Sequence, residues 1–421
     1  MQKTKTKQPP YIIILLILSG EAVFILPFVL ARIFRPTYLE AFDINNLQLG
    51  TCFSVYGIVA LFSYLFGGPL ADRFKPRHLM SVALLLTALG GFYLATYPTL
   101  ENLRLLYGFW GFTTIFLFWA AMIKATRVWG GKSKQGIAFG FLDGGRGLVA
   151  AIFGSVGVLI FSLFITKDIE LTSIAERREA FKQVIIYTSF AVIVIAVLVF
   201  FFLKFNDTED TKTKTVNKIT LVNFRIIMQF KTVWLLMIII LCAYYGYKMT
   251  DVFSLYAEDV MKYDKIESAK VGTYLLYLRP FIGVIIGLLA DRTRASLWII
   301  IGFFLTLITS LIFVSGMISD QTTLLFILSI GLMALGVYSV RVLYFAAMEE
   351  GKIPLALTGT AIGFISIVGY TPDIFSGPMI GVLLDNNPGE LGHQYVFLVL
   401  AGFTLIGLIT SITFYRINSK S

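Results

Sequence analysis

Long apolar runs recur twelve times along this chain of 421 residues. They lie near residues 11–31, 48–70, 79–97, 102–123, 136–165, 183–204, 232–256, 271–290, 297–318, 323–347, 355–384 and 394–415. A helix that crosses a bilayer needs about 20 mostly apolar residues, which each run supplies. The runs are continuous, whereas the strands of a transmembrane barrel alternate polar and apolar residues. We therefore predict an all-α membrane protein with twelve transmembrane helices.

The composition excludes several other classes of protein. Apolar residues make up 57% of the chain and charged residues only 14%, against about 25% charged in a soluble domain. This excludes a soluble enzyme, a disordered chain and a disulfide-stapled secreted domain. The sequence shows no metal-ligand cluster, phosphate-binding glycine loop or nucleophile–base pair. We therefore expect no enzymatic activity, no cofactor and no bound metal.

A polar stretch, NDTEDTKTKTVNK at 206–218, divides the runs into two sets of six. We predict an N-terminal bundle over 1–205, a cytoplasmic linker over 206–230 and a C-terminal bundle over 231–421. The halves also echo each other: GPLADR at 68–73 is repeated as GLLADR at 287–292, and the pattern GxAxGF occurs at 136–141 and at 359–364. These echoes predict two pseudo-symmetric six-helix bundles, an arrangement typical of secondary transporters.

The basic residues predict the orientation of the chain in the membrane. With the N-terminus inside, the inner segments hold 21 Lys and Arg residues and the outer segments hold 9. Cytoplasmic loops of membrane proteins carry this excess. We therefore expect a multi-pass protein of the cell inner membrane with both termini in the cytoplasm. These basic cytoplasmic loops also explain the net charge of +10, so we expect no nucleic-acid partner.

Two motifs identify a family resemblance. The segment GGPLADRFKPR at 67–77 resembles the loop G-x-L-A-D-R-x-G-R-R between helices two and three of the major facilitator superfamily. It departs from that pattern at Lys75 and Pro76. RLLYG at 104–108 resembles the fourth-helix motif R-x-x-Q-G, with Tyr107 in place of glutamine. The resemblance covers essentially the whole chain and implies transport by alternating access between two bundles.

Within that superfamily the chain is most similar to bacterial permeases grouped with sugar-phosphate and organic-anion carriers. Its fifth apolar run contains no proline, so it lacks the Gly-Pro pair of drug–proton antiporters. The resemblance also implies a gate at the cytoplasmic ends of the helices. Carboxylates there can pair with basic residues or accept bonds from a helix start. The candidate gating residues are Asp72, Arg73, Arg127 and Asp291. Alternatively, the arginines of these loops only keep them on the cytoplasmic side.

Nine charged residues lie within the apolar runs. The basic ones are Arg104, Arg146, Lys248, Arg279 and Arg341, and the acidic ones are Glu21, Asp143, Asp251 and Asp373. A charge at the bilayer centre costs about 2.5–3.5 kcal/mol on insertion scales. These side chains should therefore face a central cavity or each other, except that Arg104 lies near a helix end and can reach the headgroups.

Helical spacing pairs some of these charges. Asp143 and Arg146 are three residues apart, as are Lys248 and Asp251, so each pair shares a helix face. Such pairs either fix helix packing or serve transport. No acidic residue lies one turn from Arg279, which makes it the best candidate for gripping an anion with its planar fork. Candidate substrate-binding residues are Arg146, Arg279, Arg341, Lys248, Tyr56 and Tyr338, although buried tyrosines more often only pack helices.

Burial in an apolar environment favours the neutral form of a carboxyl group, as proton carriage requires. The candidate proton-coupling residues are Glu21, Asp143, Asp251 and Asp373, with Glu21 favoured because it lies near mid-span. The sequence thus predicts a monomeric transporter that moves a small organic anion across the bilayer, most simply by proton symport. An exchanger of organic phosphate for inorganic phosphate and a membrane-bound nutrient sensor remain alternatives.

Overall fold

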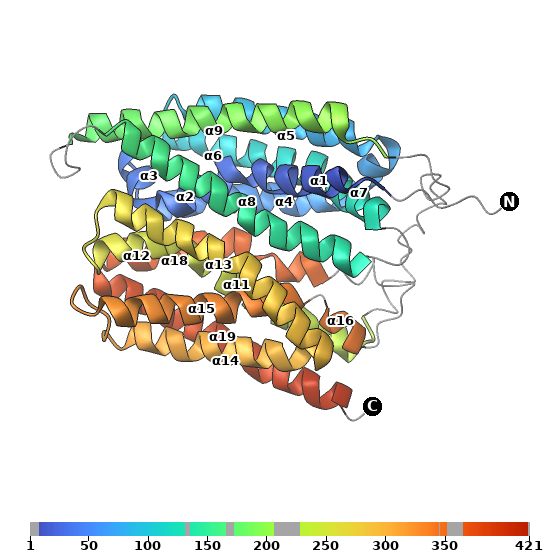
Figure 1. Ribbon diagram of the computed structural model, residues 1–421. Helices are drawn as coiled ribbons and strands as arrows, with labels where there is room; N and C mark the ends of the chain where they lie inside the picture. Colours follow the sequence, from blue (N-terminus) through green and yellow to red (C-terminus); the bar gives the residue numbers. More distant parts are fainter. Residues whose placement is uncertain are drawn as a thin grey trace. The chain divides into compact units, whose positions relative to one another are not determined.

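The fold is helical throughout the residues that the computed structural model describes, which are 8–130, 135–165, 172–205, 228–344, 346–351 and 365–419. Those residues contain twelve helices that are long and apolar enough to cross a membrane. This confirms the number of spans predicted from the apolar runs. The chain divides into two compact units (Figure 1), the first formed by residues 1–44 and 55–216 and the second by 45–54 and 217–421.

The first unit has its helices side by side along their length (Figure 1). Its elements are α1 (Pro10–Phe24), η1 (Ile25–Val29), α2 (Leu30–Ile33), α3 (Arg35–Phe42), most of α4 (Asn46–Arg73), α5 (Pro76–Leu94), α6 (Leu100–Gly111), η2 (Phe112–Trp119), α7 (Ala120–Gly130), α8 (Gln135–Leu163) and α9 (Ile174–Phe202). Helix α5 packs on α9, and α1 packs on α8. The segments η1 and η2 are π-helical, so the first and fourth spans each contain a widened turn.

The second unit contains the remaining spans and the beginning of α4. Its other elements are α11 (Lys231–Met249), η5 (Thr250–Val252), α12 (Phe253–Asp259), α13 (Lys265–Arg292), α14 (Ala295–Val314), α15 (Thr323–Leu343), α16 (Ala347–Glu350), α18 (Pro372–Asn386) and α19 (Glu390–Ser419). Helix α14 packs on both α15 and α19, and α11 packs on α19. The eleventh span combines residues 365–371 with α18.

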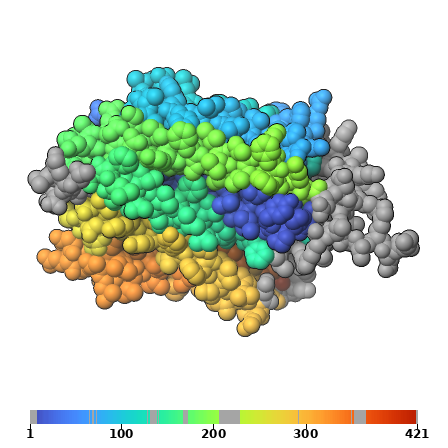
Figure 2. Space-filling view, turned by 45° about the horizontal axis from the view of Figure 1, so that its top comes forward, coloured from blue at the N-terminus to red at the C-terminus, as the bar shows by residue number. Residues whose placement is uncertain are grey.

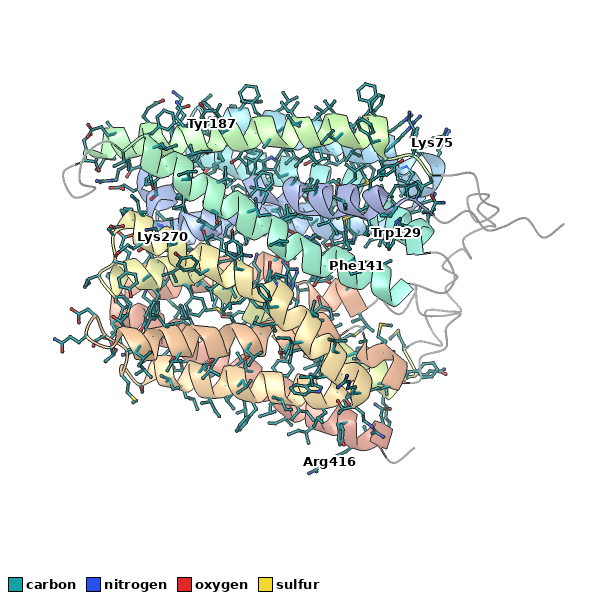
Figure 3. All side chains as sticks on the ribbon, in the orientation of Figure 1. Lys75, Trp129, Phe141, Tyr187, Lys270 and Arg416 are labelled. Atoms are coloured by element: carbon teal, nitrogen blue, oxygen red, sulfur yellow. The ribbon has the colours of Figure 1, made fainter. Side chains whose placement is uncertain are left out.

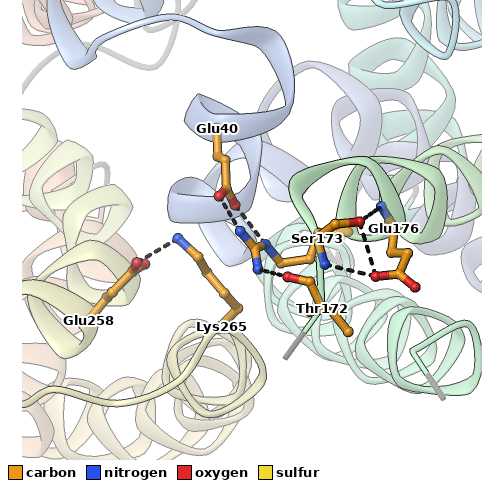
Figure 4. A network of polar contacts seen from close by, with 7 residues as sticks. Glu40, Thr172, Ser173, Glu176, Glu258 and Lys265 are labelled. Carbon is orange, nitrogen blue, oxygen red and sulfur yellow. Dashed lines mark hydrogen bonds and ion pairs between the residues drawn. The ribbon is translucent and has the colours of Figure 1, made fainter. Parts of the chain in front are cut away.

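Two spans begin well before their apolar runs, at Ile174 instead of 183 and at Lys265 instead of 271, and polar residues cap both helices. Ser173 and Glu176 form a capping box at the start of α9, as Figure 4 shows. The carboxylate of Asp264 accepts bonds from the backbone N–H groups of Ile266 and Glu267, both at 2.7 Å, at the start of α13. The first N–H groups of a helix lack partners within it, and these side chains provide them.

Ion pairs fasten neighbouring elements within each unit (Figure 4). In the first unit, Arg177 of α9 donates two bonds to the carboxylate of Glu40 in α3, at 3.0 and 2.5 Å, and a third to the carbonyl of Thr172. In the second unit, Lys265 donates to Glu258 at 2.5 Å. The bidentate Arg177–Glu40 geometry holds α3 against α9, because two parallel bonds fix both distance and angle.

Apolar side chains cover the outer surface of the first unit. Tyr187, which Figure 3 labels on α9, is 50% exposed. Phe190 and Val194 on the same helix are also more than half exposed. Figure 2 shows α8 and α9 lying side by side on this face. So large an apolar surface suits contact with lipid rather than water, and the chain is a multi-pass membrane protein.

Candidate functional site

A buried ion pair lies in the core of the first unit. The Nε atom of Arg146 in α8 donates to Oε2 of Glu21 in α1 at 3.0 Å. Their side chains are only 10% and 5% exposed. Burying two charges is costly unless they are paired and hydrogen-bonded. This contact therefore compensates both ions at once and ties α1 to α8.

Two aromatic rings lie beside this ion pair. The guanidinium carbon of Arg146 lies 5.3 Å from the ring centroid of Phe24 and 5.8 Å from that of Trp119. Phe24 directly precedes η1, and Trp119 is the last residue of η2. π-Helical turns inside α-helices are frequent at functional sites. The buried ion pair therefore lies next to the ends of both π-helical segments of this unit, which makes it a candidate functional site.

We expected Arg146 to pair with Asp143, three residues earlier on the same helix. The structure gives Arg146 a buried partner on a different helix, Glu21, which we had considered only as a proton carrier. Asp143 is half-buried on α8. The three-residue spacing that we used identifies partners only on the same helix. It could not predict the Glu21–Arg146 pair, which joins α1 and α8.

A second buried cluster lies in the second unit and is built around Lys248 of α11. The Nζ atom of Lys248 lies 3.2 Å from Oδ1 of Asp373 and 3.7 Å from Oδ2 of Asp251. The hydroxyl of Tyr244 donates to the Asp373 carboxylate, at 3.0 and 3.1 Å from its two oxygens. The predicted Lys248–Asp251 pair is present, and Asp373 joins it from another helix.

Interrupted helices position both carboxylates. Asp251 lies in η5, a 3₁₀ turn between α11 and α12. Asp373 lies in the first turn of α18, which begins at Pro372. Proline suits the first position of a helix, and a carboxylate is stabilised near a helix N-terminus. The same local sequence therefore starts α18 and places Asp373 beside Lys248.

Two guanidinium groups approach one tyrosine ring in this cluster. The Cζ atom of Arg341 lies 3.6 Å from the ring centroid of Tyr247 and 5.7 Å from that of Tyr244. The Cζ atom of Arg279 lies 5.8 Å from the Tyr247 ring. Arg279 is 2% exposed and directly precedes Pro280 inside α13. Tyr247 was missed in the sequence, although it lies three residues from Tyr244 and so shares its helix face.

The other predicted residues, Tyr56, Tyr338 and Arg104, have contacts outside the two charged clusters. The Tyr56 hydroxyl lies 2.7 Å from Oγ1 of Thr114, and its ring meets that of Phe28 edge-on at 4.6 Å. Tyr338 is fully buried in α15. Arg104 pairs with Glu101, which is 77% exposed, in keeping with its expected place near a helix end.

The predicted gating residues are only partly described. The side chains of Asp72, Arg127 and Asp291 lie outside the described residues, and Arg73 is exposed at the end of α4. Beside them, Lys124 of α7 donates to the backbone carbonyl of Ala71 at 2.8 Å. This bond connects α7 to the end of α4, in the part of the first unit where the gating motif lies.

The described residues contain no group of three or more His, Cys, Asp or Glu side chains arranged to hold a metal ion. The two buried clusters consist instead of ion pairs and tyrosines. Buried carboxylates, an ammonium and guanidinium groups, together with tyrosine hydroxyls and rings, can bind an anion or exchange a proton.

Comparison with known proteins agrees with this architecture. The model of the Major Facilitator Superfamily matches residues 12–377. The inner membrane proteins YihN and YqcE of Escherichia coli K12 are 26% and 24% identical to this chain. The YihN alignment covers 97% of this chain and 95% of the relative, and the YqcE alignment covers 94% and 92%.

Two solved structures share the fold. A bacterial homologue of the human lysosomal transporter Spinster, in an inward-facing and unoccupied conformation, matches with a TM-score of 0.70 and 14% identity over 97% of this chain and 96% of that one. The nucleoside transporter NupG matches with a TM-score of 0.70 and 14% identity over 95% and 100%. At this identity the likeness concerns the fold alone, and it confirms the predicted twelve-helix architecture.

Proposed function

Because the chain belongs to the Major Facilitator Superfamily, whose fold serves secondary transport by alternating access, we propose that it carries a small organic anion coupled to protons. The anion is bound in part by the buried cluster of the second unit. The proton is carried by a buried carboxylate, with Glu21 as the first candidate. The anion would cross the cell inner membrane.

The observation that carries the anion proposal is the charge of the second-unit cluster. Among its described residues, Arg279 and Arg341 lie over the tyrosine rings, and Lys248 adds a third positive charge that pairs with the two carboxylates of Asp251 and Asp373. A net charge inside the membrane is expensive. Because cations outnumber carboxylates among the described residues of this cluster, it suits an anionic solute better than a cationic one.

The ring contacts suit a planar anion with an apolar part. A guanidinium stacked on a ring keeps its edge N–H groups available in the plane, and such a fork fits the two oxygens of a carboxylate. The tyrosine rings offer flat apolar surface beside it. A small carboxylate with a flat apolar part matches this surface better than a neutral sugar.

Ligand-induced thermal stabilisation of the purified protein tests the solute class. Carboxylates, sugar acids, sugar phosphates and neutral sugars would be compared at equal concentration and ionic strength. We expect stabilisation by anionic members only. Stabilisation by neutral sugars with no response to any anion would contradict the proposal.

The Glu21–Arg146 pair supports the coupling proposal. Glu21 is buried, and its described partner is a single guanidinium, so protonation would leave Arg146 without its counter-charge. Breaking a buried pair from one side is strongly unfavourable. Proton binding at Glu21 would therefore favour a rearrangement of α1 against α8, which is the kind of event that couples a proton to a conformational change.

A further inference from the structure

Helix α4 is divided between the two units, and its beginning is bound by a residue from the other end of the chain. Residues 45–54, here called the docking segment, group with the second unit, whereas α4 from Val55 onward groups with the first. Oδ1 of Asp385 accepts bonds from the backbone N–H of Asn46 at 3.0 Å and from its side-chain Nδ2 at 3.2 Å. Oδ2 of Asp385 accepts the backbone N–H of Leu47 at 2.6 Å.

These bonds complete the N-terminal cap of α4. Asn45 and Gln48 already cap each other, because Oδ1 of Asn45 accepts the Gln48 N–H at 2.8 Å and Oε1 of Gln48 accepts the Asn45 N–H at 2.9 Å. That local cap leaves the N–H groups of Asn46 and Leu47, which have no acceptor within the helix. Asp385 supplies the acceptor, and its negative charge suits the N-terminus of α4.

The position of Asp385 in its own helix points to the same role. Asp385 lies in the last turn of α18, where a carboxylate meets the negative end of the helix dipole and is disfavoured. It is therefore poorly placed to stabilise α18 and well placed to hold α4. We therefore assign Asp385 to the contact between α18 and the start of α4 rather than to the stability of α18.

The docking segment lies against α18 at very short range. A Cβ atom on Gly50 would overlap the backbone of Gly377, and one on Gly381 would overlap the backbone of Leu47. Only glycine permits this approach. The hydroxyl of Ser54 donates to the carbonyl of Ile374, which places the far end of the docking segment next to the residue that follows Asp373.

The docking segment also reaches the charged cluster. Its Phe53 ring centroid lies 5.3 Å from Nζ of Lys248, within the range of a cation–π contact. Helix α18 thus carries Asp373, the partner of Lys248, in its first turn and Asp385 in its last. One helix therefore carries both a residue of the proposed anion site and the residue that holds the docking segment.

We propose that Asp385 is a latch residue of the transport cycle: it holds the docking segment on α18 in the state seen here, and the segment leaves α18 when the carrier opens on that side of the membrane. The inference rests on alternating access and not on the identity of the solute. The contact is suited to repeated breaking, because the freed groups are N–H groups and a carboxylate that water can solvate at the membrane surface.

Thiol accessibility in the docking segment measures the latch directly. The reference protein carries Ser54→Cys and Cys52→Ala, so the introduced thiol faces Ile374 and Cys242 is the other thiol. Cys242 is buried in the second unit, at 1% exposure, and reports unfolding. The protein is placed in nanodiscs, and maleimide labelling of both thiols is followed by mass spectrometry without any solute.

Asp385→Asn and Asp385→Ala should raise the labelling rate at position 54, alanine more than asparagine, by about tenfold, the factor that corresponds to about 1.4 kcal/mol. Labelling of Cys242 should stay unchanged. Asp320→Asn is the matched control: Asp320 is exposed in the loop between α14 and α15, and its substitution should change neither rate. An unchanged rate at position 54 in both Asp385 variants would overturn the latch.

A reciprocal pair of variants separates the latch from a purely structural role. Asn46→Asp places a second carboxylate beside Asp385 and should also raise labelling at position 54. The double variant Asn46→Asp with Asp385→Asn restores a donor–acceptor pair with its direction reversed, and should bring the rate back toward the reference. Equal increases at position 54 and at Cys242 would assign Asp385 to the stability of the unit and overturn its role in the cycle.

Discussion

Nε of Arg146 lies 3.0 Å from Oε2 of Glu21, although 125 residues separate the two along the chain. Both side chains are buried within the first unit, and the guanidinium also faces the rings of Phe24 and Trp119. Each charge therefore depends on the other for its compensation. A change in the protonation of Glu21 must act on Arg146, and through it on the contact between α1 and α8.

The first prediction concerns proton coupling. Glu21→Gln removes the titratable group but keeps a side chain of similar size. We expect concentrative uptake to be lost while exchange of solute across the membrane persists, because exchange needs no net proton movement. Uptake and counterflow in proteoliposomes, with and without a proton gradient, measure the two activities.

Glu101→Gln is the control for that experiment, because Glu101 forms an exposed pair with Arg104 in the same unit and should have no effect. A Glu21→Gln protein that still accumulates solute against its gradient would transfer the coupling role to Asp143, Asp251 or Asp373.

The second prediction concerns stability. Glu21→Gln or Arg146→Gln alone leaves one buried charge without its counter-ion, which costs about 3–5 kcal/mol. The double variant removes both charges and should cost clearly less than the sum of the single variants. Unfolding of the four proteins in one detergent measures this difference as a coupling free energy. The exposed Arg104–Glu101 pair, treated in the same way, should show about 0–1 kcal/mol.

The third prediction concerns the anion site. Arg279→Lys and Arg341→Lys keep the charge but lose the planar fork that lies over the Tyr247 ring, so affinity for an anionic solute should fall by about tenfold or more. Arg279→Ala should lose nearly all ligand-induced stabilisation. Isothermal titration and thermal shift with the same solute check both effects.

Arg294→Lys is the matched control for the anion site. Arg294 also faces a ring, that of Tyr415 at 5.6 Å, but it is exposed and outside the cluster, so affinity should not change. A normal ligand response in Arg279→Ala would contradict the anion-site assignment.

The fourth prediction concerns the gating motif. Asp72→Asn should slow transport and leave solute affinity nearly unchanged, because the resemblance places Asp72 in a contact that stabilises one conformation. Initial transport rates and binding are measured on the same preparation, with Asp320→Asn as the control. Transport at the reference rate would remove Asp72 from the gate.

The fifth prediction concerns topology. The excess of Lys and Arg predicts that residues 206–218 face the cytoplasm. An impermeant thiol reagent added to intact cells should therefore miss a cysteine placed at Thr211 and label one placed at Asp320. The reverse pattern would invert the orientation.

The sequence determined the class of this protein because bilayer crossing is a local requirement. About 20 apolar residues must follow one another in each span, and every span must satisfy its own backbone hydrogen bonds. Those conditions can be read from composition, and they give twelve helices. The Lys248–Asp251 pair was also predictable, because three residues on one helix bring the two side chains to the same face.

Tertiary structure decided which distant groups meet. Glu21 rather than a residue on α8 compensates Arg146 in the described contacts, and Asp373 joins Lys248 from α18. Asp385 carried no signal in the sequence, since a carboxylate near a helix end is ordinary until the start of α4 lies against it. Such partners depend on how helices pack across hundreds of residues. Burial makes these contacts specific, because a charge that is removed from water is stable only when a counter-charge or hydrogen-bond donors contact it.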